Sequence, residues 1–460
     1  MSSALKPRRP RGRANAELLR GSSDAVEVLT GTVLRSAAEG RYVVHVEAPA
    51  NGGSDEAGDG SENKPFATIK AAMAALPAVP QEPSDYALIK VGAGDFEYDY
   101  SYAGQLESVY VSGAFGSEET ITVQAVTPVA NNAVEVDIQA TADIQTAVSR
   151  IGGAFLEASF GAEYRDYALY ADLVVSKPAA DTIRIAGNWW GAAQGDVLTL
   201  STPATRIVPP AVGYPSVRIG RNTKLSYSNI VHDWTGYADF YTLSLKNIYY
   251  MFCCSVICPK IVLYDGSDSR ALDSWLNCYF NCTDTFQVQK RIGHASSQVC
   301  CVLDATTLLF MEAAGNSFSR ALLLDGSKVE NRQFNGKASL SSTTYNGSHV
   351  RNCSAPFVVD GPYNHALFTG GLTVEGNCSR HVLVSNGGRV AYDEGSSFGA
   401  TTDVPVQIEE GVVTGAASLS FTNSTTPGEE IKVGSNAAQA FSSLPATDFV
   451  GASATGSRAT

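Results

Sequence analysis

Four carboxylates recur at one position of a repeated phrase, and they are the first residues whose spacing could do chemistry. They stand seven residues after the phrase begins, at Asp265, Asp325, Asp360 and Glu409. If the copies stack as strands about 4.8 Å apart, the acids approach the separation of about 5 Å that retaining glycosidases use. Three of the four are followed by Gly, however, and Asp-Gly is an ordinary turn sequence. The pattern therefore favours strand-ending turns and leaves a catalytic pair as the alternative.

Aromatic residues form the second candidate set. Phe96, Tyr98, Tyr100 and Tyr102 alternate strictly, and further aromatic residues concentrate between positions 189 and 275. Aromatic faces stack on sugar rings, and neighbouring acids such as Asp233 accept hydrogen bonds from sugar hydroxyls. Core and subunit-interface packing explains the same composition without a sugar. The candidates for glycan contact are Trp189, Trp190, Trp234, Tyr237, Asp239, Tyr241 and Trp275.

Metal and cofactor sites are not indicated. The nine Cys are an odd number and have no paired zinc spacing, and the chain has six His. We expect no metal and no cofactor, and we predict that most thiols are small buried groups in a protein made in a reducing compartment.

The elements that must position these residues are short strands that recur. The phrase opens at Cys258, Cys282, Cys353, Cys378 and Thr402, at steps of 24 or 25 residues, except that Phe318 divides a gap of 71. This period is typical of a solenoid, with loops of about a dozen extra residues expected in the two passes on either side of Phe318. The fourth and sixth residues after each opening are large and mostly apolar, which predicts one inward face of a strand in each coil. These pairs are Val262 and Tyr264, Phe286 and Val288, Leu322 and Leu324, Phe357 and Val359, Val382 and Val384, and Val406 and Ile408.

The chain divides into five segments by composition. We expect a docking arm over 1–50, a polar hinge, capping helix and first coil over 51–100, an irregular or inserted β region over 101–215, regular coils over 216–415, and a C-terminal strand and tail over 416–460. The helix is predicted from an apolar stripe at Phe66, Ile69, Met73 and Leu76, which ends at Pro77. A helix there would cover the open end of the solenoid.

Charge separates the first residues from the rest. Residues 1–20 contain six basic residues and the single acid Glu17, without the apolar run of a signal peptide, while the whole chain has a net charge of −13. A disordered tail and a peg for an acidic partner fit this arm equally. The acidic remainder argues against nucleic-acid binding, and no segment indicates membrane insertion.

The entry segment resembles a known group of proteins. Its acidic Gly-rich stretch, Pro65-Phe-Ala-Thr-Ile69, Ala-rich helix and following strand are similar to the start of right-handed parallel β-helix proteins of the pectin-lyase-like type. That group is common in phage tailspikes and head spikes and in carbohydrate-active enzymes. The resemblance covers Asp55 to Phe96 by phrase and Ser228 to Gly411 by period, and it implies a homotrimer anchored by its N-terminal part.

These observations predict an all-β protein with a right-handed parallel β-helix, a short N-terminal capping helix and an inserted β domain. We expect a homotrimeric spike on the surface of a phage or virus-like particle, made in the bacterial cytoplasm, that joins a capsid or tail protein through its arm. Its expected function is attachment to a host surface polysaccharide. A polysaccharide depolymerase, either lyase or glycosidase, and a purely structural decoration protein are the alternatives.

Overall fold

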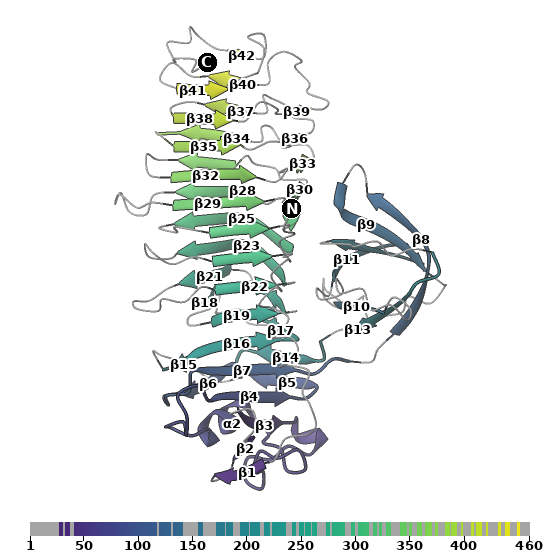
Figure 1. Ribbon diagram of the computed structural model, residues 1–460, viewed down its shortest axis with the longest axis vertical. Coiled ribbons are helices and arrows are strands. Elements are labelled where there is room, and N and C mark those ends of the chain that lie inside the picture. The colour runs from purple at the N-terminus through teal and green to yellow at the C-terminus, as the bar shows by residue number, and fades with distance from the viewer. Residues whose placement is uncertain are drawn as a thin grey trace, which may run out of the picture.

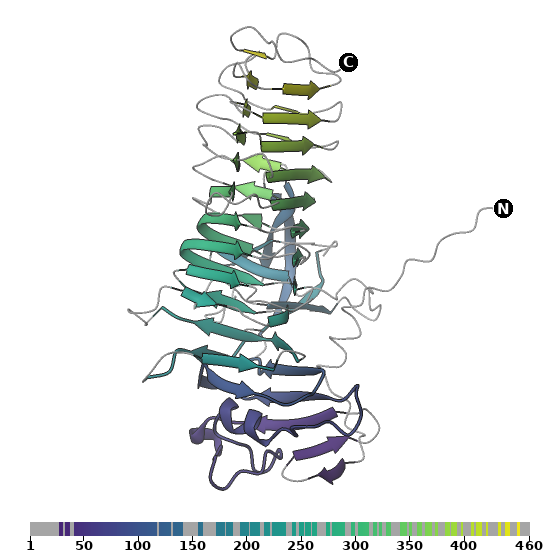
Figure 2. The same cartoon turned by 90° about the vertical axis from the view of Figure 1, so that its left-hand side faces the viewer.

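The computed structural model describes residues 27–30, 33–36 and 41–116, most of 119–140, 155–159, most of 172–186, most of 194–235, and beyond 235 chiefly the strands themselves. In these residues the chain is predominantly β, and most strand pairs are parallel. The strands lie across the long axis and stack along it (Figures 1 and 2).

The parallel strands form three columns. The first is a fifteen-stranded sheet, which begins with antiparallel pairs and continues with parallel ones. Its strands are β1 (Glu27–Thr30), β2 (Val33–Ser36), β3 (Arg41–Val46), β4 (Tyr86–Val91), β7 (Ser108–Gly113), β16 (Lys224–Ser228), β19 (Ile248–Phe252), β22 (Asp273–Leu276), β24 (Ser296–Val299), β26 (Asn316–Ser319), β29 (Ser341–Asn346), β32 (Asn364–Thr369), β35 (Gly388–Tyr392), β38 (Gly411–Gly415) and β41 (Ala438–Phe441).

The second and third columns share the long strands β23 (Tyr279–Gln289) and β25 (Val302–Met311). The second also contains β5 (Gly94–Glu97), β14 (Thr205–Val208), β17 (Ile230–Asp233), β20 (Ser255–Ile257), β27 (Leu322–Leu323), β30 (His349–Arg351), β33 (Thr373–Glu375), β36 (Ser397–Phe398) and β39 (Ser420–Phe421). The third also contains β18 (Thr242–Ser244), β21 (Lys260–Tyr264), β28 (Lys328–Arg332), β31 (Phe357–Asp360), β34 (Val382–Ser385), β37 (Val406–Ile408), β40 (Ile431–Val433) and β42 (Phe449–Val450).

The pairing register confirms part of the predicted repeat. Phe357 pairs with Val382 and Val382 with Val406, so the phrases that begin at Cys353, Cys378 and Thr402 lie on consecutive passes in the predicted frame. The sixth positions agree as well, since Val359 pairs with Val384 and Val384 with Ile408. The openings themselves, Cys353, Cys378 and Thr402, lie outside the described residues.

Two of the predicted phrases are out of register. Phe286 pairs with Ile261 rather than with Val262, so the Cys258 phrase is one residue out of frame, and β23 has an irregularity between Cys282 and Thr285. The Cys282 phrase keeps the later frame, since Val288 shares its column with Val359. Leu322 pairs with Val302 and His349, in the second column, so it does not share the column of Phe357.

Two passes that carry no phrase, β25 and β28, explain the second error, because they divide the stretch from Val288 to Val359 at Phe310 and Asn331. Third-column partners follow one another at steps of 21 to 28 residues, from 310 to 331 at the shortest and from 331 to 359 at the longest, with no pass of 35 or 36. Strand β28 holds Glu330 and Asn331 in that column, and its polar sequence hides it from a search for apolar alternation. The partners are Leu263, Val288, Phe310, Asn331, Val359, Val384, Ile408 and Val433.

The base of the stack differs from the expected arm and hinge. Strand β3 pairs in parallel with β4 along its whole length, so residues 41–46 belong to the same sheet as the strands that follow the expected hinge. The hinge itself is folded: Asp55 accepts hydrogen bonds from the backbone N–H groups of Ala67 and Thr68, at 2.8 and 3.0 Å. Its carboxylate thereby holds the loop against the chain that enters the helix.

The predicted helix is present as α2 (Ile69–Ala75), preceded by the 3-10 turn η1 (Pro49–Asn51). Thr68 caps it, because its hydroxyl accepts the N–H of Ala71 at 3.0 Å. The four residues of the predicted stripe, Phe66, Ile69, Met73 and Leu76, are all buried. The helix packs on β3, β4 and β6 (Asp99–Tyr102), and β6 pairs in parallel with β15 (Ser216–Ile219).

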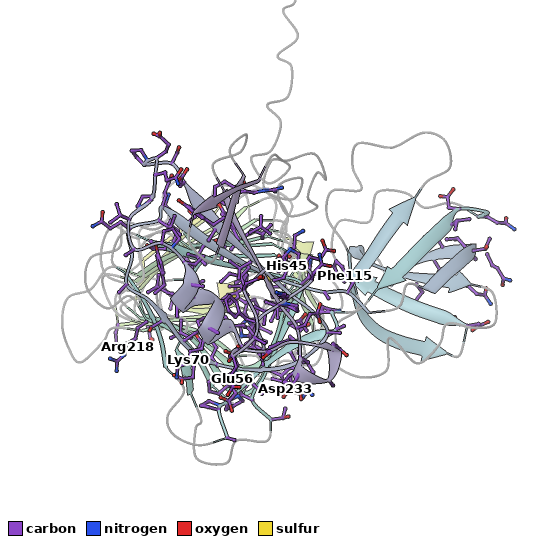
Figure 3. The ribbon with its side chains drawn as sticks, turned by 90° about the horizontal axis from the view of Figure 1, so that it is seen from below. His45, Glu56, Lys70, Phe115, Arg218 and Asp233 are labelled. Carbon is purple, nitrogen blue, oxygen red and sulfur yellow. The ribbon has the colours of Figure 1, made fainter. Side chains whose placement is uncertain are left out.

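An antiparallel barrel interrupts the parallel strands between β7 and β14. It consists of β8 (Glu119–Val129), β9 (Asn132–Ala140), β10 (Phe155–Ser159), β11 (Asp172–Ala179), β12 (Thr182–Ala186) and β13 (Val197–Ser201). It stands beside the stack (Figure 1), and Phe115 lies on the side where the two meet (Figure 3).

A short neck joins the barrel to the stack. Phe115 and Pro203 form an antiparallel bridge, and the N–H of Ala204 donates to the carbonyl of Ala114 at 2.8 Å. The buried hydroxyl of Thr205 accepts the N–H of Ala114 at 2.8 Å and lies 2.7 Å from the carbonyl oxygen of Gly92. Gly113 has no room for a Cβ atom, which would lie 2.3 Å from the carbonyl oxygen of Asn229.

Replacing Thr205 with Val should destabilise this neck. Valine keeps the shape of threonine but leaves the Ala114 N–H and the Gly92 carbonyl without their partner, at a cost of about 1 to 3 kcal/mol. Hydrogen exchange of the Ala114 amide should accelerate correspondingly. Thr205→Ser retains the hydroxyl and serves as the control, and equal protection in both variants would refute this role.

Candidate functional site

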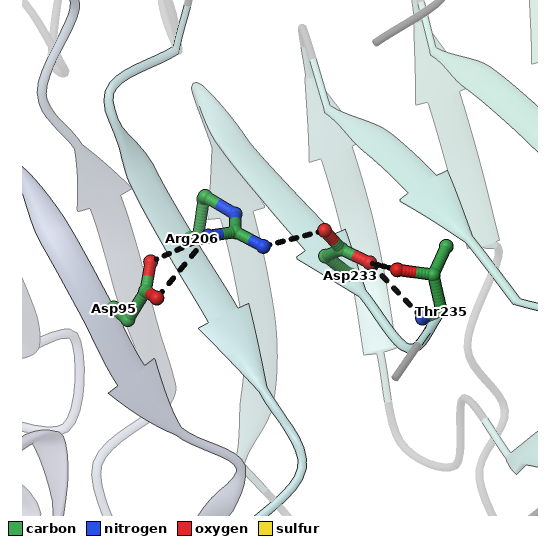
Figure 4. Close-up of polar contacts among 4 residues, drawn as sticks. All are labelled: Asp95, Arg206, Asp233 and Thr235. Carbon is green, nitrogen blue, oxygen red and sulfur yellow. Dashed lines mark hydrogen bonds and ion pairs between the residues drawn. The ribbon is translucent and has the colours of Figure 1, made fainter. Parts of the chain in front are cut away.

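The candidate site is a row of charged side chains across three neighbouring strands of the second column. Strand β14 lies between β5 and β17, with Arg206 paired to Asp95 on one side and to Val231 on the other. The side chain of Arg206 reaches both neighbours (Figure 4). We call Asp95, Arg206, Asp233 and Thr235 the charged ladder.

Arg206 bridges two carboxylates. One guanidinium nitrogen lies 3.0 and 3.1 Å from the two carboxylate oxygens of Asp95, and the other lies 2.6 Å from Asp233. The second oxygen of Asp233 accepts the N–H and the hydroxyl of Thr235, at 3.0 and 2.7 Å. The ladder grades from the half-exposed Asp95 side chain to the Asp233 side chain, which is 9% exposed.

The ladder keeps its inner carboxyl ionised. Burial alone would raise the pKa of Asp233, but the hydrogen bonds from Thr235 and Arg206, together with the Arg206 charge, lower it below its usual value. The hydrogen bond to Asp233 in turn raises the pKa of the Arg206 guanidinium. A general acid needs the opposite shift, since it must carry a proton near neutral pH.

The charged ladder is therefore better suited to a structural role than to catalysing hydrolysis. Both carboxylate oxygens of Asp233 accept hydrogen bonds from protein groups, whereas the sequence predicted that Asp233 would accept hydrogen bonds from sugar hydroxyls. Sequence reasoning missed Asp95 and Arg206, which lie 111 positions apart, so no local pattern could have linked them.

Behind the ladder lies a buried aromatic core. Phe96, Tyr98, Tyr100 and Tyr102 are each at most 4% exposed, which supports the packing alternative for this alternating set. The hydroxyls of Tyr100 and Tyr227 are hydrogen-bonded to each other. Burial raises the pKa of both phenols, so they stay neutral.

Trp234, a predicted glycan contact, belongs to this core. Its side chain is 1% exposed, and its ring meets that of Tyr98 edge to face at 5.4 Å between centroids. A sugar could not stack on a face that is covered in this way. Trp234 thus corrects the sequence prediction, because its buried inward position was not visible from the clustering of aromatic residues along the chain.

His232 is the second residue that sequence reasoning missed. It pairs with Ile207 on one side and Val256 on the other, so a histidine occupies an otherwise apolar ladder. It is fully buried, and within the part of the chain that the structure describes neither ring nitrogen has a hydrogen-bond partner. The rings of Tyr227 and Tyr98 face it edge to face, at 4.8 and 6.1 Å. Burial lowers the pKa of His232 to about 3.

Most of the other predicted site residues lie where the structure gives no description of their side chains. Asp265, Asp325, Glu409, Trp189, Trp190, Tyr237, Asp239 and Tyr241 lie outside the described residues. Asp360 ends β31 and pairs with Ser385, and Trp275 lies in β22 between Met251 and Gln298, but the side chains of both are outside the description. The Phe318 phrase is out of register with the Cys353 phrase, so the predicted alignment of Asp325 with Asp360 no longer follows from the repeat.

The described cysteines lie in the core. Cys254, Cys258 and Cys278 are buried and form no disulfide, as predicted for small core residues. The described part of the chain contains no group of three or more His, Cys, Asp and Glu side chains that could hold a metal ion. Nor does any helix in it have the length and apolar character needed to cross a membrane.

Comparison with known proteins gives no family. No protein-family model matches the chain, and no curated protein matches it. Among solved structures, one similar chain is a GH136 lacto-N-biosidase from Eubacterium ramulus, in a selenomethionine derivative, at 11% identity and a TM-score of 0.24. The match covers 85% of this chain and 67% of that one. At this TM-score the likeness supports neither a fold nor an activity.

Proposed function

We propose that this protein is the attachment spike of a phage or virus-like particle, and that it binds a host surface polysaccharide without cleaving it. Its parallel strands would form the shaft of a right-handed β-helix, with three copies assembled side by side. Two observations support the proposal: the long stack of parallel strands, and the resemblance of the entry segment to parallel β-helix proteins.

The observation that carries the proposal is the continuous parallel register. Pairs run without a break from β3 through β4 and β7 to β16, and onward to β41. A chain whose passes each contact only their neighbours builds an elongated body rather than a globule. Such a body holds a binding surface away from the point where it is anchored, which is what attachment requires.

Binding is preferred to cleavage because of the charged ladder. In the described residues, the carboxylates of Asp95 and Asp233 share one partner, because Arg206 forms an ion pair with each of them. A glycosidase needs one protonated carboxyl beside an ionised one, so this pair does not supply the division of roles. The purely structural alternative, a decoration protein, shares the shaft and differs only in having no ligand.

The base of the stack restricts which segment could dock. Because β3 is paired with β4 along its length, residues from Arg41 onward contribute to the sheet. Strands β1 and β2 extend the same sheet back to Glu27, so a segment that docks without disturbing it ends before Glu27. The basic residues of 1–20 lie within that segment and suit an acidic partner on the particle.

Incubation with purified capsular polysaccharide and lipopolysaccharide tests the proposal. We expect a trimer by light scattering, saturable binding to at least one of these polymers, and no new reducing ends or unsaturated sugar products. Product formation that disappears in Asp360→Asn would instead establish a depolymerase. A folded trimer that binds none of the polymers, and none of the host cells from which they were purified, would point to the decoration protein.

A further inference from the structure

The strand pair that joins the neck to the stack is short, and it contains His232. Strands β14 and β17 pair at three positions, the first of which joins Thr205 to Ile230. The last joins Ile207 to His232. Thr205 also binds the neck, because its hydroxyl accepts the N–H of Ala114 at 2.8 Å. The neck and the buried imidazole therefore depend on the same few backbone hydrogen bonds.

The entering chain, the leaving chain and the start of β17 meet at one tightly packed point. A Cβ atom on Gly113 would lie 2.8 Å from the Cβ of Thr205 and 2.9 Å from the Cγ1 of Ile230. The residue before Ile230, Asn229, has a φ of +57°, in the left-handed region that residues other than Gly seldom adopt. Its side-chain oxygen is buried and, among the described residues, has no hydrogen-bond partner. A shift of β14 against β17 would therefore disturb the neck directly.

Strand β14 differs from its neighbours in how the chain enters it. Strands β5, β17 and β20 each follow a first-column strand after one or two residues, whereas β14 follows β13 of the barrel. In the residues that the structure describes, no barrel strand pairs with a strand of the three parallel columns. Movement of β14 would therefore carry the barrel with it and break no strand pair within the barrel, whereas movement of β5, β17 or β20 would pull on the first column.

The groups that face His232 offer its imidazole no counter-charge. Its ladder neighbours are the apolar Ile207 and Val256. Tyr98 and Tyr227 face it edge to face, and burial raises the pKa of both phenols, so they stay neutral. The other titratable or charged groups nearby lie next to Tyr227 or on the opposite face of the strands: Tyr100 and Cys254 beside Tyr227, and Asp95, Arg206 and Asp233 in the charged ladder. Asp233 directly follows His232, so its side chain points to the other face.

We infer that His232 makes the neck acid-sensitive: when its imidazole takes up a proton from the solvent, β14 detaches from β5 and β17, and the barrel leaves its fixed position while the rest of the stack stays paired. A positive charge that is buried without a partner is costly, and the departure of β14 opens the site to water. This inference goes beyond the proposed attachment function and does not depend on it, because it concerns the position of the barrel whatever the barrel binds.

Hydrogen exchange of the full-length protein between pH 7 and pH 5, corrected for the pH dependence of the intrinsic exchange rate, tests the inference. The reporting amides are Gly94, Tyr98 and Ala114, which donate to Ala204, to Val208 and to the hydroxyl of Thr205 respectively. Their exchange should be about 25-fold faster at pH 5 than at pH 7, the ratio expected when opening exposes an imidazole with a pKa of 6.5. The rise should begin near pH 6.5 with a slope of one proton.

Amides outside the neck provide the internal controls. Those of Glu47 at the base, Val123 in the barrel and Trp234 after β17 donate to Phe66, Asp196 and Ile257 respectively. Because these hydrogen bonds do not involve β14, their exchange should change by less than about threefold. Equal acceleration of the neck and control amides would mean global unfolding and would overturn the inference, as would unchanged exchange at the neck. A rise that begins only below pH 5 would assign the effect to carboxylates instead.

Variants identify the titrating group. His232→Phe and His232→Leu should keep slow exchange at the neck at pH 7 and lose the acceleration at pH 5, and either variant suffices if the other does not fold. His45→Gln changes a partly buried histidine at the base and should keep the full acceleration. Acceleration that persists without His232, or that disappears in His45→Gln, would overturn the role of His232.

Discussion

Replacing Trp234 with Ala should lower the free energy of unfolding by about 3 to 5 kcal/mol, the usual cost of deleting a large buried aromatic side chain. Trp234 is 1% exposed and packs against Tyr98, so its removal leaves a cavity between β5 and β17. Hydrogen exchange of the amides in these two strands should accelerate by several orders of magnitude. Polysaccharide binding should fall only as far as the folded fraction falls.

An exposed apolar residue provides the control for this variant. Val79 is 66% exposed, so Val79→Ala should change stability by no more than about 0.5 kcal/mol. The informative contrary result is a Trp234→Ala protein that melts like the wild type but no longer binds polysaccharide. That outcome would mean that Trp234 reaches the ligand, and the burial described above could not be its resting state.

Acidification should destabilise the parallel stack through His232. Its pKa is about 3 in the folded protein and 6.5 in the unfolded chain, so below pH 6.5 the unfolded state binds the proton more readily. Stability is therefore unaffected by this group above pH 6.5 and is lost progressively as the pH falls from 6.5 towards 3. At about 1.4 kcal/mol per pH unit, the loss reaches about 2 kcal/mol at pH 5.

His232→Phe should abolish this component of acid sensitivity. The phenylalanine ring suits a ladder that already contains Phe96 and Phe280, and it removes two buried nitrogens that lack partners in the described part of the chain. The measurement is the denaturation midpoint at pH 7 and at pH 5, a range in which the facing Tyr98 and Tyr227 stay neutral. Carboxylates with lowered pKa, such as Asp233, lose their contribution only at more acidic pH.

His45 supplies the matched comparison. Partial burial and the charge of Lys90 lower the pKa of His45 as well, so His45→Gln measures how much of the acid sensitivity comes from the base of the stack. We expect most of the loss between pH 7 and pH 5 to persist in His45→Gln and to disappear in His232→Phe. Equal behaviour of the two variants would contradict the assignment to His232.

The sequence predicted those parts of the fold whose signals are local. The phrases at Cys353, Cys378 and Thr402 lie on consecutive passes because nothing interrupts their ladder, and α2 follows from an apolar stripe that ends at Pro77. The prediction was wrong where one strand carried a different sequence. β28 places Asn331 in a column of apolar residues, and β21 joins that column through Leu263 rather than the predicted Tyr264, which exchanges the two faces of that strand.

The candidate site was less accessible to sequence reasoning. Arg206 meets Asp95 only because the chain leaves the stack at Gly113, forms the barrel and returns at Thr205 in register with Gly94. Such a contact depends on topology, and no spacing along the chain encodes it. Trp234 failed as a glycan candidate for a related reason: aromatic composition is the same for a binding surface and for a core, and only burial separates them.

The position of the neck also sets a mechanical path. The barrel joins the stack at β7 and β14, and along the first column only β4 and β3 separate β7 from the N-terminal hairpin of β1 and β2. If the barrel holds the host and residues before Glu27 hold the particle, tension between them crosses these few strands and the hairpin. The passes from β16 to β41 lie beyond the neck and carry none of it. Resistance to being pulled off the host would then depend on the hydrogen bonds among β1, β2, β3, β4 and β7, and shortening the far end of the stack would leave that resistance unchanged.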